Sequence, residues 1–336
     1  MNATAFERLD ALPRDRLGLT PTPITAAPEL AHALGLRELW IKRDELIGFG
    51  FGGNKVRGLE LLLAHARAQS ADVLVTGAGA QSNHVRATAA AAAYAGMDAV
   101  AIYWGDAPLS MQGNLKLTHC LGAEIRFTGN LDRTQVDVAI EAVADELRTV
   151  GRRPYPIPRG GACALGVLGH VLAARELHRQ CVAIDRMPGT IVQAVGSGGT
   201  LAGWLLGTAM LGARWRVEGV SVSRPADEAR DRVVQLAGEA AALLDLPQMV
   251  SASDVTIHDG FIGDGYGVPS LAGDDAVMKA ARIQGLFFDP TYTGKAFAGL
   301  CSLTKAGRID DRAPVVFIHT GGEPALFVNG STGLTR

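Results

Sequence analysis

Short apolar runs alternate with longer amphipathic stretches along most of the chain. The runs that we interpret as the complete set of buried strands cover residues 73–77, 99–104, 124–127, 190–195, 217–222 and 315–319. The stretches that we interpret as helices cover residues 82–94, 112–121 and 132–150, with another helix starting at Thr200. Short apolar strands separated by helices indicate a parallel sheet covered on both faces. The pattern therefore predicts an α/β protein.

The length of the chain predicts two domains. At 336 residues, with 48% hydrophobic and 20% charged residues, the chain is long enough for a large core and for a second domain. Three prolines stiffen residues 154–158, which makes this segment the best candidate for a crossing between two lobes. We expect two open parallel-sheet domains of unequal size with a cleft between them. The smaller is expected at residues 70–156, and the larger at residues 1–69 and 157–336.

Composition disfavours several classes of function. The net charge is −2, and we find no basic patch and no Cys/His spacing of a metal site, so neither nucleic acid nor metal is expected. No signal pattern opens the chain and no long apolar run occurs, so we expect no membrane contact. The four cysteines are scattered, which is typical of reduced thiols in the cytoplasm.

One lysine lies between a glycine-rich turn and a polar loop further along the chain. Lys55 ends the run Gly-Gly-Asn-Lys, and residues 79–86 read Gly-Ala-Gln-Ser-Asn-His-Val-Arg. Only six of the 32 basic residues are lysines, so Lys55 is unlike the usual solvating charge. This arrangement suits a Schiff base to an aldehyde cofactor. Taken alone, Lys55 also reads as a surface lysine at a helix start, and Ser82 as an ordinary helix N-cap.

A second glycine-rich turn covers residues 196–200, directly after a predicted strand. Backbone N–H groups at the start of a helix can hold a phosphate there. The turn lacks the Walker and dinucleotide signatures, and by itself it also fits a simple tight turn. Tyr266 and Tyr292 lie in turn-rich loops, where a tyrosine often only fills a surface. The joint occurrence of these loops after strands favours one shared site, because open parallel sheets bind ligands at that edge.

Taken in order, these motifs resemble one known family. They are Lys42-Arg-Asp44, Gly52-Gly-Asn-Lys55, Gln81-Ser-Asn-His84, Gly196 to Thr200, Gly265-Tyr-Gly-Val-Pro269, Asp289 to Lys295 and His319-Thr-Gly-Gly322. The chain resembles the pyridoxal-phosphate enzymes of the D-cysteine desulfhydrase and 1-aminocyclopropane-1-carboxylate deaminase family, which have fold type II. The resemblance runs from about residue 20 to residue 327, and it implies a homodimer with the cofactor between the domains.

The resemblance also implies a role for each matching position. Lys55 matches the Schiff-base lysine, Asn83 the partner of the cofactor's phenolic oxygen, and Thr293 the partner of the pyridine nitrogen. The implied catalytic residues are Lys55, Ser82, Tyr266 and Tyr292. The implied cofactor-binding residues are Asn54, Lys55, Asn83, Gly196, Ser197, Gly198, Gly199, Thr200 and Thr293. The implied substrate-binding residues are Gln81, Ser82, Asn83 and His84.

Three positions bear on the reaction. The cyclopropane-opening enzymes of the family carry glutamate where this chain has Thr293, so the resemblance favours β-elimination, with D-cysteine giving pyruvate, sulfide and ammonia. Gly58 replaces a lysine that usually reaches the phosphate, so Arg57 or backbone dipoles are expected to compensate. Phe49 or Phe51 is expected to reshape the substrate pocket. Ring opening, a lyase reaction on L-cysteate or another β-substituted amino acid, and a non-catalytic binding module remain alternatives.

Overall fold

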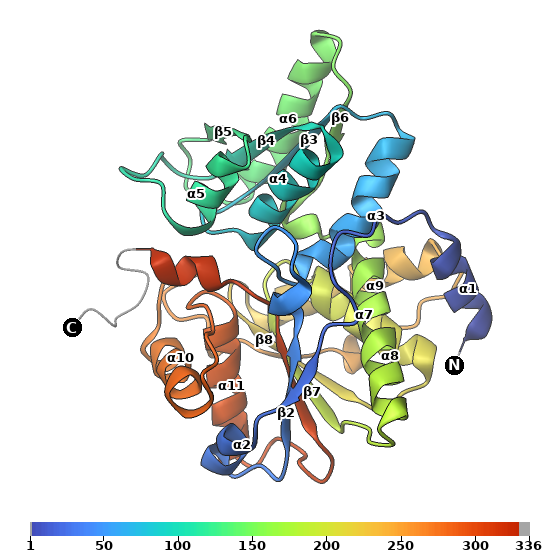
Figure 1. The fold of residues 1–336 in the computed structure, drawn as a ribbon, viewed down its shortest axis with the longest axis vertical. Coiled ribbons are helices and arrows are strands. Elements are labelled where there is room, and N and C mark those ends of the chain that lie inside the picture. Colours follow the sequence, from blue (N-terminus) through green and yellow to red (C-terminus); the bar gives the residue numbers. More distant parts are fainter. Residues whose placement is uncertain (1, 329–336) are drawn as a thin grey trace.

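The computed structural model describes residues 2–328 and builds them around two separate sheets (Figure 1). The larger sheet has the strand order β1-β2-β10-β7-β8-β9, and the smaller has the order β5-β4-β3-β6. Neighbouring strands in both sheets are parallel except β1 and β2, which pair antiparallel. The predicted α/β class with two sheets is therefore confirmed.

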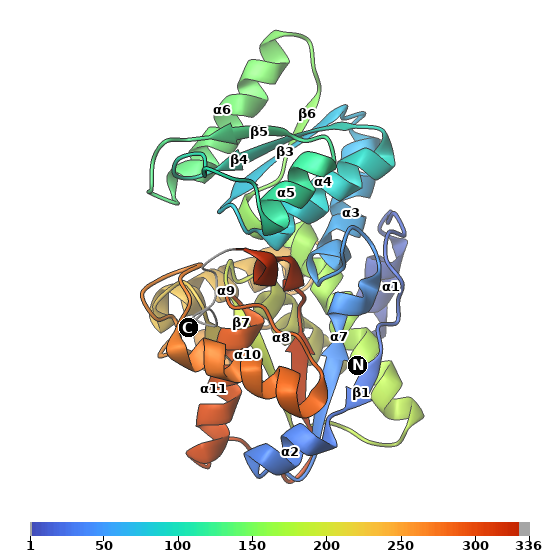
Figure 2. The same ribbon diagram turned by 60° about the vertical axis from the view of Figure 1, so that its left-hand side comes forward.

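Helices cover both faces of the larger sheet (Figure 2). Its strands are β1 (Ile24–Ala26), β2 (Leu39–Arg43), β7 (Thr190–Val195), β8 (Arg216–Ser221), β9 (Thr256–His258) and β10 (Val315–His319). One face carries α1 (Ala3–Ala11), α7 (Ala164–Ala183), α8 (Gly199–Leu211) and α9 (Ala226–Ala242), and the other carries α2 (Pro28–Leu34), α10 (Leu271–Gln284) and α11 (Thr293–Lys305). Neighbouring strand residues alternate between the two cores: Val316 packs with the first set of helices and Phe317 with the second.

The smaller sheet is covered in the same way. Its strands are β3 (Val73–Ala78), β4 (Asp98–Tyr103), β5 (Glu124–Phe127) and β6 (Pro154–Pro156), and its helices are α4 (Asn83–Ala95), α5 (Gly113–Cys120) and α6 (Gln135–Thr149). Helix α6 packs on one face through Val75 and Ile102, whereas α4 and α5 pack on the other. Helix α3 (Lys55–Ala68) joins the two parts, because it packs on the smaller sheet and also against α7. Short 3₁₀ turns lie at Asp44–Ile47, Arg159–Gly161, Ala252–Asp254 and Glu323–Phe327.

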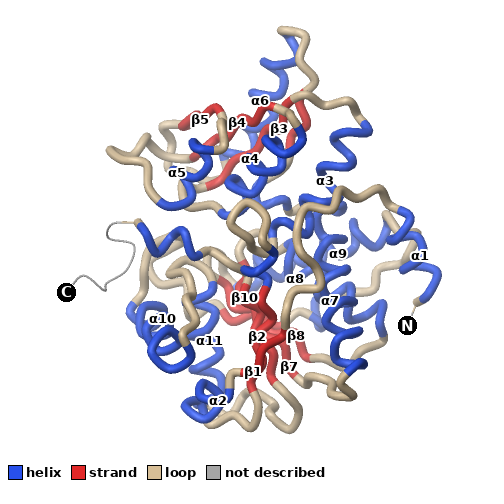
Figure 3. The backbone as a smooth tube through the Cα atoms, viewed as in Figure 1, coloured by secondary structure: helices blue, strands red, loops and turns tan. Residues whose placement is uncertain are grey.

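Two predictions about the elements are wrong. The six predicted strands are not the complete set, because β2 is a buried strand that carries Lys42 and so did not read as apolar. Residues 154–156 do not form the crossing: they form edge strand β6, where proline is tolerated because one side of the strand needs no ladder bond. After β6 the chain passes through the turn Arg159–Gly161 into α7, which packs on the larger sheet; Figure 3 shows the strands of the two sheets as two separate groups.

The predicted domain limits at residues 70 and 156 stay a prediction, and residues 1 and 329–336 lie outside the described part of the chain. Within residues 2–328, no helix combines the length and the apolar character that crossing a membrane requires. No cluster of His, Cys, Asp or Glu that could hold a metal ion occurs in the same range.

Candidate active site

A cleft lies where the carboxyl ends of strands from both sheets meet. It holds about 810 Å³ of space that protein atoms do not fill, part of which is open to solvent. Ala78 at the end of β3, Val195 at the end of β7 and Thr320 after β10 all line it. The predicted site residues that line it are Asn54, Lys55, Ser82, Asn83, His84, Gly196, Ser197, Gly198, Thr200, Tyr266 and Tyr292.

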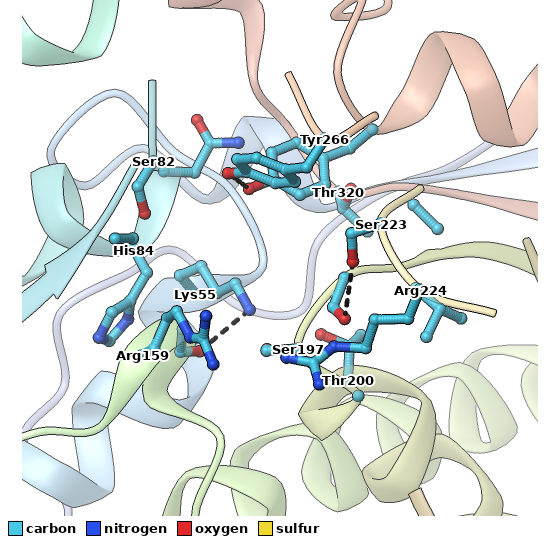
Figure 4. Close-up of a pocket in the computed structure, with 18 of the residues that line it drawn as sticks. Lys55, Ser82, His84, Arg159, Ser197, Thr200, Ser223, Arg224, Tyr266 and Thr320 are labelled. Atoms are coloured by element: carbon cyan, nitrogen blue, oxygen red, sulfur yellow. Dashed lines mark hydrogen bonds between the residues drawn. The ribbon is translucent and has the colours of Figure 1, made fainter. Parts of the chain in front are cut away.

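Lys55 is the first residue of α3, and its amine faces the cleft (Figure 4). The Nζ atom donates a hydrogen bond to the carbonyl oxygen of Gly160 over 3.1 Å, and no ion pair of Lys55 occurs among the described residues. Burial without a compensating carboxylate lowers the pKa of Lys55 to about 8. A substantial share of the amine is therefore neutral near pH 7–8, which both nucleophilic attack and proton removal require.

The turn between β7 and α8 offers an anion site. Gly198 has φ +93°, and this left-handed conformation is open to glycine at little cost. Thr200 lies in the first turn of α8, where its Oγ accepts a hydrogen bond from Asn54 Nδ2 over 2.9 Å and lies 3.4 Å from His170 Nε2. Because the oxygen accepts from Asn54, its own hydrogen can turn either to His170 Nε2 or to an anion in the cleft, where the helix N–H groups also point.

The start of α4 offers a second anion site. Ser82 is the N-cap of this helix, and its Oγ accepts from the backbone N–H of Val85 over 3.3 Å. Asn83 is fixed through its Oδ1, which accepts from Asn114 Nδ2 over 2.8 Å. Burial and the nearby charge of Lys55 lower the pKa of His84 to about 3, so this imidazole is neutral. The free hydroxyl hydrogen of Ser82 and the helix dipole therefore suit a carboxylate.

Tyr266 and Tyr292 face the cleft as a hydrogen-bonded pair of hydroxyl groups. Their rings meet edge to face with centroids 5.8 Å apart, and Tyr266 also contacts Trp104 at 5.5 Å. Burial raises the pKa of Tyr266 to about 12 and also raises the pKa of Tyr292 well above its ordinary value. Both hydroxyl groups are therefore protonated at neutral pH and can donate.

Thr293 does not reach the cleft, and its predicted contact with a pyridine nitrogen is not supported. The residue is fully buried, its Oγ donates to Asp289 Oδ1 over 2.8 Å, and the same oxygen accepts from the backbone N–H of Asp289. The hydroxyl group thus closes the turn that carries Tyr292. Thr320 lines the cleft instead, in the motif after β10 to which we had assigned no role.

Two further residues that we predicted as part of the site do not line the cleft. The side chain of Gln81 holds the start of α5: its Oε1 accepts from Asn114 N over 2.9 Å and its Nε2 donates to Gln112 O over 3.1 Å. Gly199 contributes only backbone to the first turn of α8 and is not among the lining residues. The predicted effect of the two loop phenylalanines on the pocket is wrong as well, because Phe49 packs on Tyr94 and Phe51 is 56% exposed outside the cleft.

The glycine at position 58 follows from helix packing. A Cβ atom on Gly58 would lie 2.8 Å from the carbonyl oxygen of Gly166, so α3 and α7 approach too closely for a lysine there. Arg57 does not compensate, since it is 4% exposed and is held by Asp44 at 2.7 Å and Glu176 at 2.9 Å. Sequence reasoning missed Arg224, which lines the cleft beside Ser197 (Figure 4).

The arrangement fits a cofactor that carries an aldehyde and a phosphate. Lys55 supplies a partly neutral amine, the turn at residues 196–200 supplies N–H donors, and Thr200 supplies a hydroxyl hydrogen that can turn to an anion or to His170 Nε2. The Arg224 Nε atom is buried without a hydrogen-bond partner, and its charge stands near the same turn. The fold and the cleft thus define the class of the molecule, an α/β enzyme that works through such a cofactor.

Comparison with known proteins identifies the family. The model of the pyridoxal-phosphate dependent enzymes matches residues 16–321, and the chain belongs to that family. It is 40% identical to D-cysteine desulfhydrase of Salmonella choleraesuis (strain SC-B67) over 327 residues, which is 96% of this chain and 98% of the relative. The corresponding enzyme of Salmonella paratyphi C is 39% identical over the same shares of the two chains.

Solved structures agree with this assignment. The crystal structure of an ACC deaminase homologue superposes with TM-score 0.90 and 36% identity, covering 97% of each chain. An O-ureido-L-serine synthase has TM-score 0.66 at 19% identity, over 95% of this chain and 92% of its own. The second likeness shows the fold alone. Pyridoxal phosphate is therefore the cofactor of the family to which this enzyme belongs.

Proposed function

We propose that this enzyme catalyses β-elimination from a small amino acid, with D-cysteine and water giving pyruvate, hydrogen sulfide and ammonia. The observation that carries the proposal is the position of Lys55, whose amine faces the same cleft as the hydroxyl groups of Tyr266 and Tyr292. The D-cysteine desulfhydrases at 39–40% identity, which align over nearly the whole chain, support the choice of substrate.

Each residue of the site has a proposed role that follows from its position. Lys55 holds the cofactor aldehyde, and the turn at residues 196–200 with Thr200 holds the phosphate. The bound cofactor supplies an electron sink for the carbon that loses its proton. Ser82 and the α4 N-terminus bind the substrate carboxylate and so fix the amino acid in the cleft.

Proton transfer completes the proposed reaction. Once the substrate amine has replaced it, the neutral Lys55 amine accepts the proton from Cα, because its pKa of about 8 allows it to act as a base. The Cβ–S bond then breaks with its electron pair on sulfur. The hydroxyl pair of Tyr266 and Tyr292 provides a proton for the departing sulfur, since both groups stay protonated. Water then converts the remaining enamine to pyruvate and ammonia.

Ring opening of 1-aminocyclopropane-1-carboxylate fits the site less well. None of the described residues that line the cleft is Asp or Glu. No lining carboxylate is therefore available to keep a pyridine nitrogen protonated, and the neutral Thr320 is the lining residue after β10. A reaction with a good leaving group on the β-carbon needs less electron withdrawal than opening of a carbon ring.

A panel of amino acids tests the proposal. D-cysteine, L-cysteine, 3-chloro-D-alanine and 1-aminocyclopropane-1-carboxylate would be incubated with the purified enzyme, and 2-oxo acid and ammonia would be measured. We expect pyruvate from D-cysteine and 3-chloro-D-alanine. Pyruvate from neither compound would contradict the proposal, as would efficient formation of 2-oxobutyrate.

Assembly, location and domain limits belong to the same proposal. The family resemblance supports a homodimer, and the four described cysteines, all without disulfides, are compatible with a cytoplasmic enzyme. Residues 70–156 are proposed as the smaller domain because they contain all four strands of the smaller sheet. Light scattering coupled to gel filtration measures the assembly directly.

A further inference from the structure

Two buried residues outside the cleft, Arg86 and Asn114, lie behind the cleft residue Asn83. Asn83 is the first residue of α4 and lines the cleft, whereas neither Arg86 nor Asn114 does so. Arg86 lies further along α4 and Asn114 lies in the first turn of α5, and each is only 1% exposed. The two helices lie side by side on the same face of the smaller sheet (Figure 2). The proposed β-elimination assigns no role to either residue.

The side-chain amide of Asn114 has only one orientation that satisfies its neighbours. Arg86 Nε, which can only donate, donates to Asn114 Oδ1 over 2.7 Å. Asn114 Nδ2 donates to the carbonyl oxygen of Gln81 over 3.0 Å, and this oxygen can only accept. Exchanging the oxygen and the nitrogen of Asn114 would set two donors against each other at one end and two acceptors at the other. The Asn114 amide is therefore fixed from both sides.

The orientation of Asn114 decides that of Asn83. Asn114 Nδ2 also donates to Asn83 Oδ1 over 2.8 Å, so the oxygen of the Asn83 amide is turned to the interior. This leaves Asn83 Nδ2 for the cleft, and the nitrogen has no hydrogen bond to another residue within residues 2–328. Its hydrogens need an acceptor. Asn83 therefore presents a donor, and not an acceptor, to a ligand in the cleft.

Close packing holds the start of α5 against the loop that carries Asn83. Gly113 has φ +55°, and a Cβ atom there would lie 2.4 Å from Gln81 Oε1. The same oxygen accepts from the backbone N–H of Asn114 over 2.9 Å. Moving α5 away from α4 would break this bond together with those of the Asn114 side chain. The position of Asn114 behind Asn83 is thus built into the fold.

Arg86 adds a charge that its hydrogen-bond partners do not neutralise. Its Nη2 donates to the carbonyl oxygen of Gly52 over 3.0 Å, and its Nη1 is buried without a partner. The negative charge of Glu323 acts on Arg86, but the two side chains form no ion pair. An arginine stays protonated at neutral pH, and a buried cation favours the anionic form of a nearby group. Because hydrogen bonds in series polarise one another, the charge strengthens the donor that Asn83 presents.

We propose that Arg86 and Asn114 are positioning residues that turn the Asn83 amide so that its Nδ2 donates to the phenolic oxygen of pyridoxal phosphate. The inference rests on the proposed attachment of the cofactor aldehyde to Lys55, because the phenolic oxygen lies on the ring carbon beside the one that bears the aldehyde. Lys55 and Asn83 line the same cleft. The family resemblance implies the contact between Asn83 and this oxygen, and the two buried residues are what orients it.

A comparison of two cofactors tests the orientation without turnover. Cofactor-free enzyme would be titrated with pyridoxal phosphate and with 3-deoxypyridoxal phosphate, which lacks the phenolic oxygen. In Asn114→Asp the new carboxylate can accept from Arg86 but cannot donate, so Asn83 must turn its Nδ2 inward and its oxygen to the cleft. We expect this variant to lose about tenfold or more affinity for pyridoxal phosphate beyond any loss for the analogue. Equal losses for both compounds would show a merely structural role and overturn the proposal.

The absorbance of the bound cofactor gives a second readout. The proton shared by the phenolic oxygen and the Schiff-base nitrogen stays on nitrogen while the oxygen accepts a hydrogen bond, and this form absorbs at the longer wavelength. Asn114→Asp and Arg86→Gln should therefore both shift absorbance toward the shorter wavelength. Arg86→Lys should restore part of the long-wavelength band, because lysine keeps the charge. Spectra like that of the unaltered enzyme in both Asn114→Asp and Arg86→Gln would sink the idea.

A matched control separates the relay from the substitution itself. Asn2→Asp makes the same change at the N-cap of α1, where a carboxylate can also accept from the backbone N–H of Ala5. This variant should keep the affinities and the spectrum of the unaltered enzyme. Melting temperatures show which variants fold. If Asn114→Asp does not fold, the affinity ratio for the two cofactors in Arg86→Gln and Arg86→Lys decides: partial restoration by lysine supports the proposal, and unaltered ratios in both contradict it.

This proposal and the β-elimination fail separately. The expected changes in affinity and absorbance, in an enzyme that forms no pyruvate from D-cysteine, would contradict the β-elimination and leave the role of Arg86 and Asn114 standing. Pyruvate from D-cysteine, together with the same affinity ratio in the unaltered enzyme and the variants at both positions, would contradict the positioning role alone.

Discussion

Replacing Thr200 with valine removes one hydroxyl group from the phosphate turn while keeping the shape of the side chain. In the enzyme this oxygen accepts from Asn54 Nδ2 over 2.9 Å, and its hydrogen can turn from His170 Nε2, 3.4 Å away, to the phosphate. A hydrogen bond to a charged group contributes about 1.5–3 kcal/mol, which corresponds to a loss of roughly 10- to 150-fold in affinity. Asn54 Nδ2 loses its acceptor in the free and in the loaded variant alike, so that penalty falls on stability and not on cofactor affinity.

The assay is a titration of the cofactor-free enzyme with pyridoxal phosphate, followed by absorbance of the bound cofactor. We expect weaker binding by about tenfold or more in Thr200→Val, with a smaller change in turnover once the cofactor is saturating. The matched control is Thr208→Val, on the same helix, where a hydroxyl group of similar burial donates to Trp204 O over 2.7 Å away from the cleft. Equal cofactor affinity in both variants and the unaltered enzyme would refute the position of the phosphate.

Three further predictions concern Lys55, Thr293 and the buried histidines. The turnover number kcat for D-cysteine should rise with pH and level off above about 8, because the Lys55 amine, once the substrate has replaced it, must be neutral to accept the proton; a pH–rate profile checks this. Thr293→Glu should lower the melting temperature and give no ring opening, because the new carboxylate would be buried against Asp289; calorimetric melting and a 2-oxobutyrate assay check this. Burial lowers the pKa of His84, His170 and His319 to about 3, so between pH 6.5 and 3 these histidines take up protons only on unfolding. Stability should therefore be greatest above pH 6.5 and fall as the pH drops toward 3. Melting temperatures across this range measure the effect.

The sequence predicted the parts of the fold that follow from local pattern. The strand at 190–195 and the turn after it were found because an apolar run and three glycines leave little choice of structure. Strand β2 was missed because Lys42 looks polar in the sequence. In the structure its charge is paired with Glu176 at 2.5 Å, a partner 134 residues away that no local pattern announces.

The residues of the candidate site also fall into two groups, those that the local sequence places and those that it does not. Lys55 and Ser82 lie at helix starts, and their positions follow from the turns that precede them. Thr293 was misplaced because adjacent residues of a helix start face different directions, and the hydroxyl group bonds Asp289 instead of the cleft. Arg133 and Arg159, which also line the cleft, were not foreseen, since they follow β5 and β6 at opposite edges of the smaller sheet and meet only when that sheet has formed.

Mapping the cofactor-bearing lysine tests the central claim most directly. The enzyme loaded with pyridoxal phosphate would be reduced with borohydride and digested, and the peptides would be examined by mass spectrometry. The chain has six lysines, so the result distinguishes among few candidates. We predict that the phosphopyridoxyl group is found on Lys55 and is absent from that peptide without reduction. Finding it on another lysine, Lys295 for example, or on none, would contradict the account of this cleft as the active site.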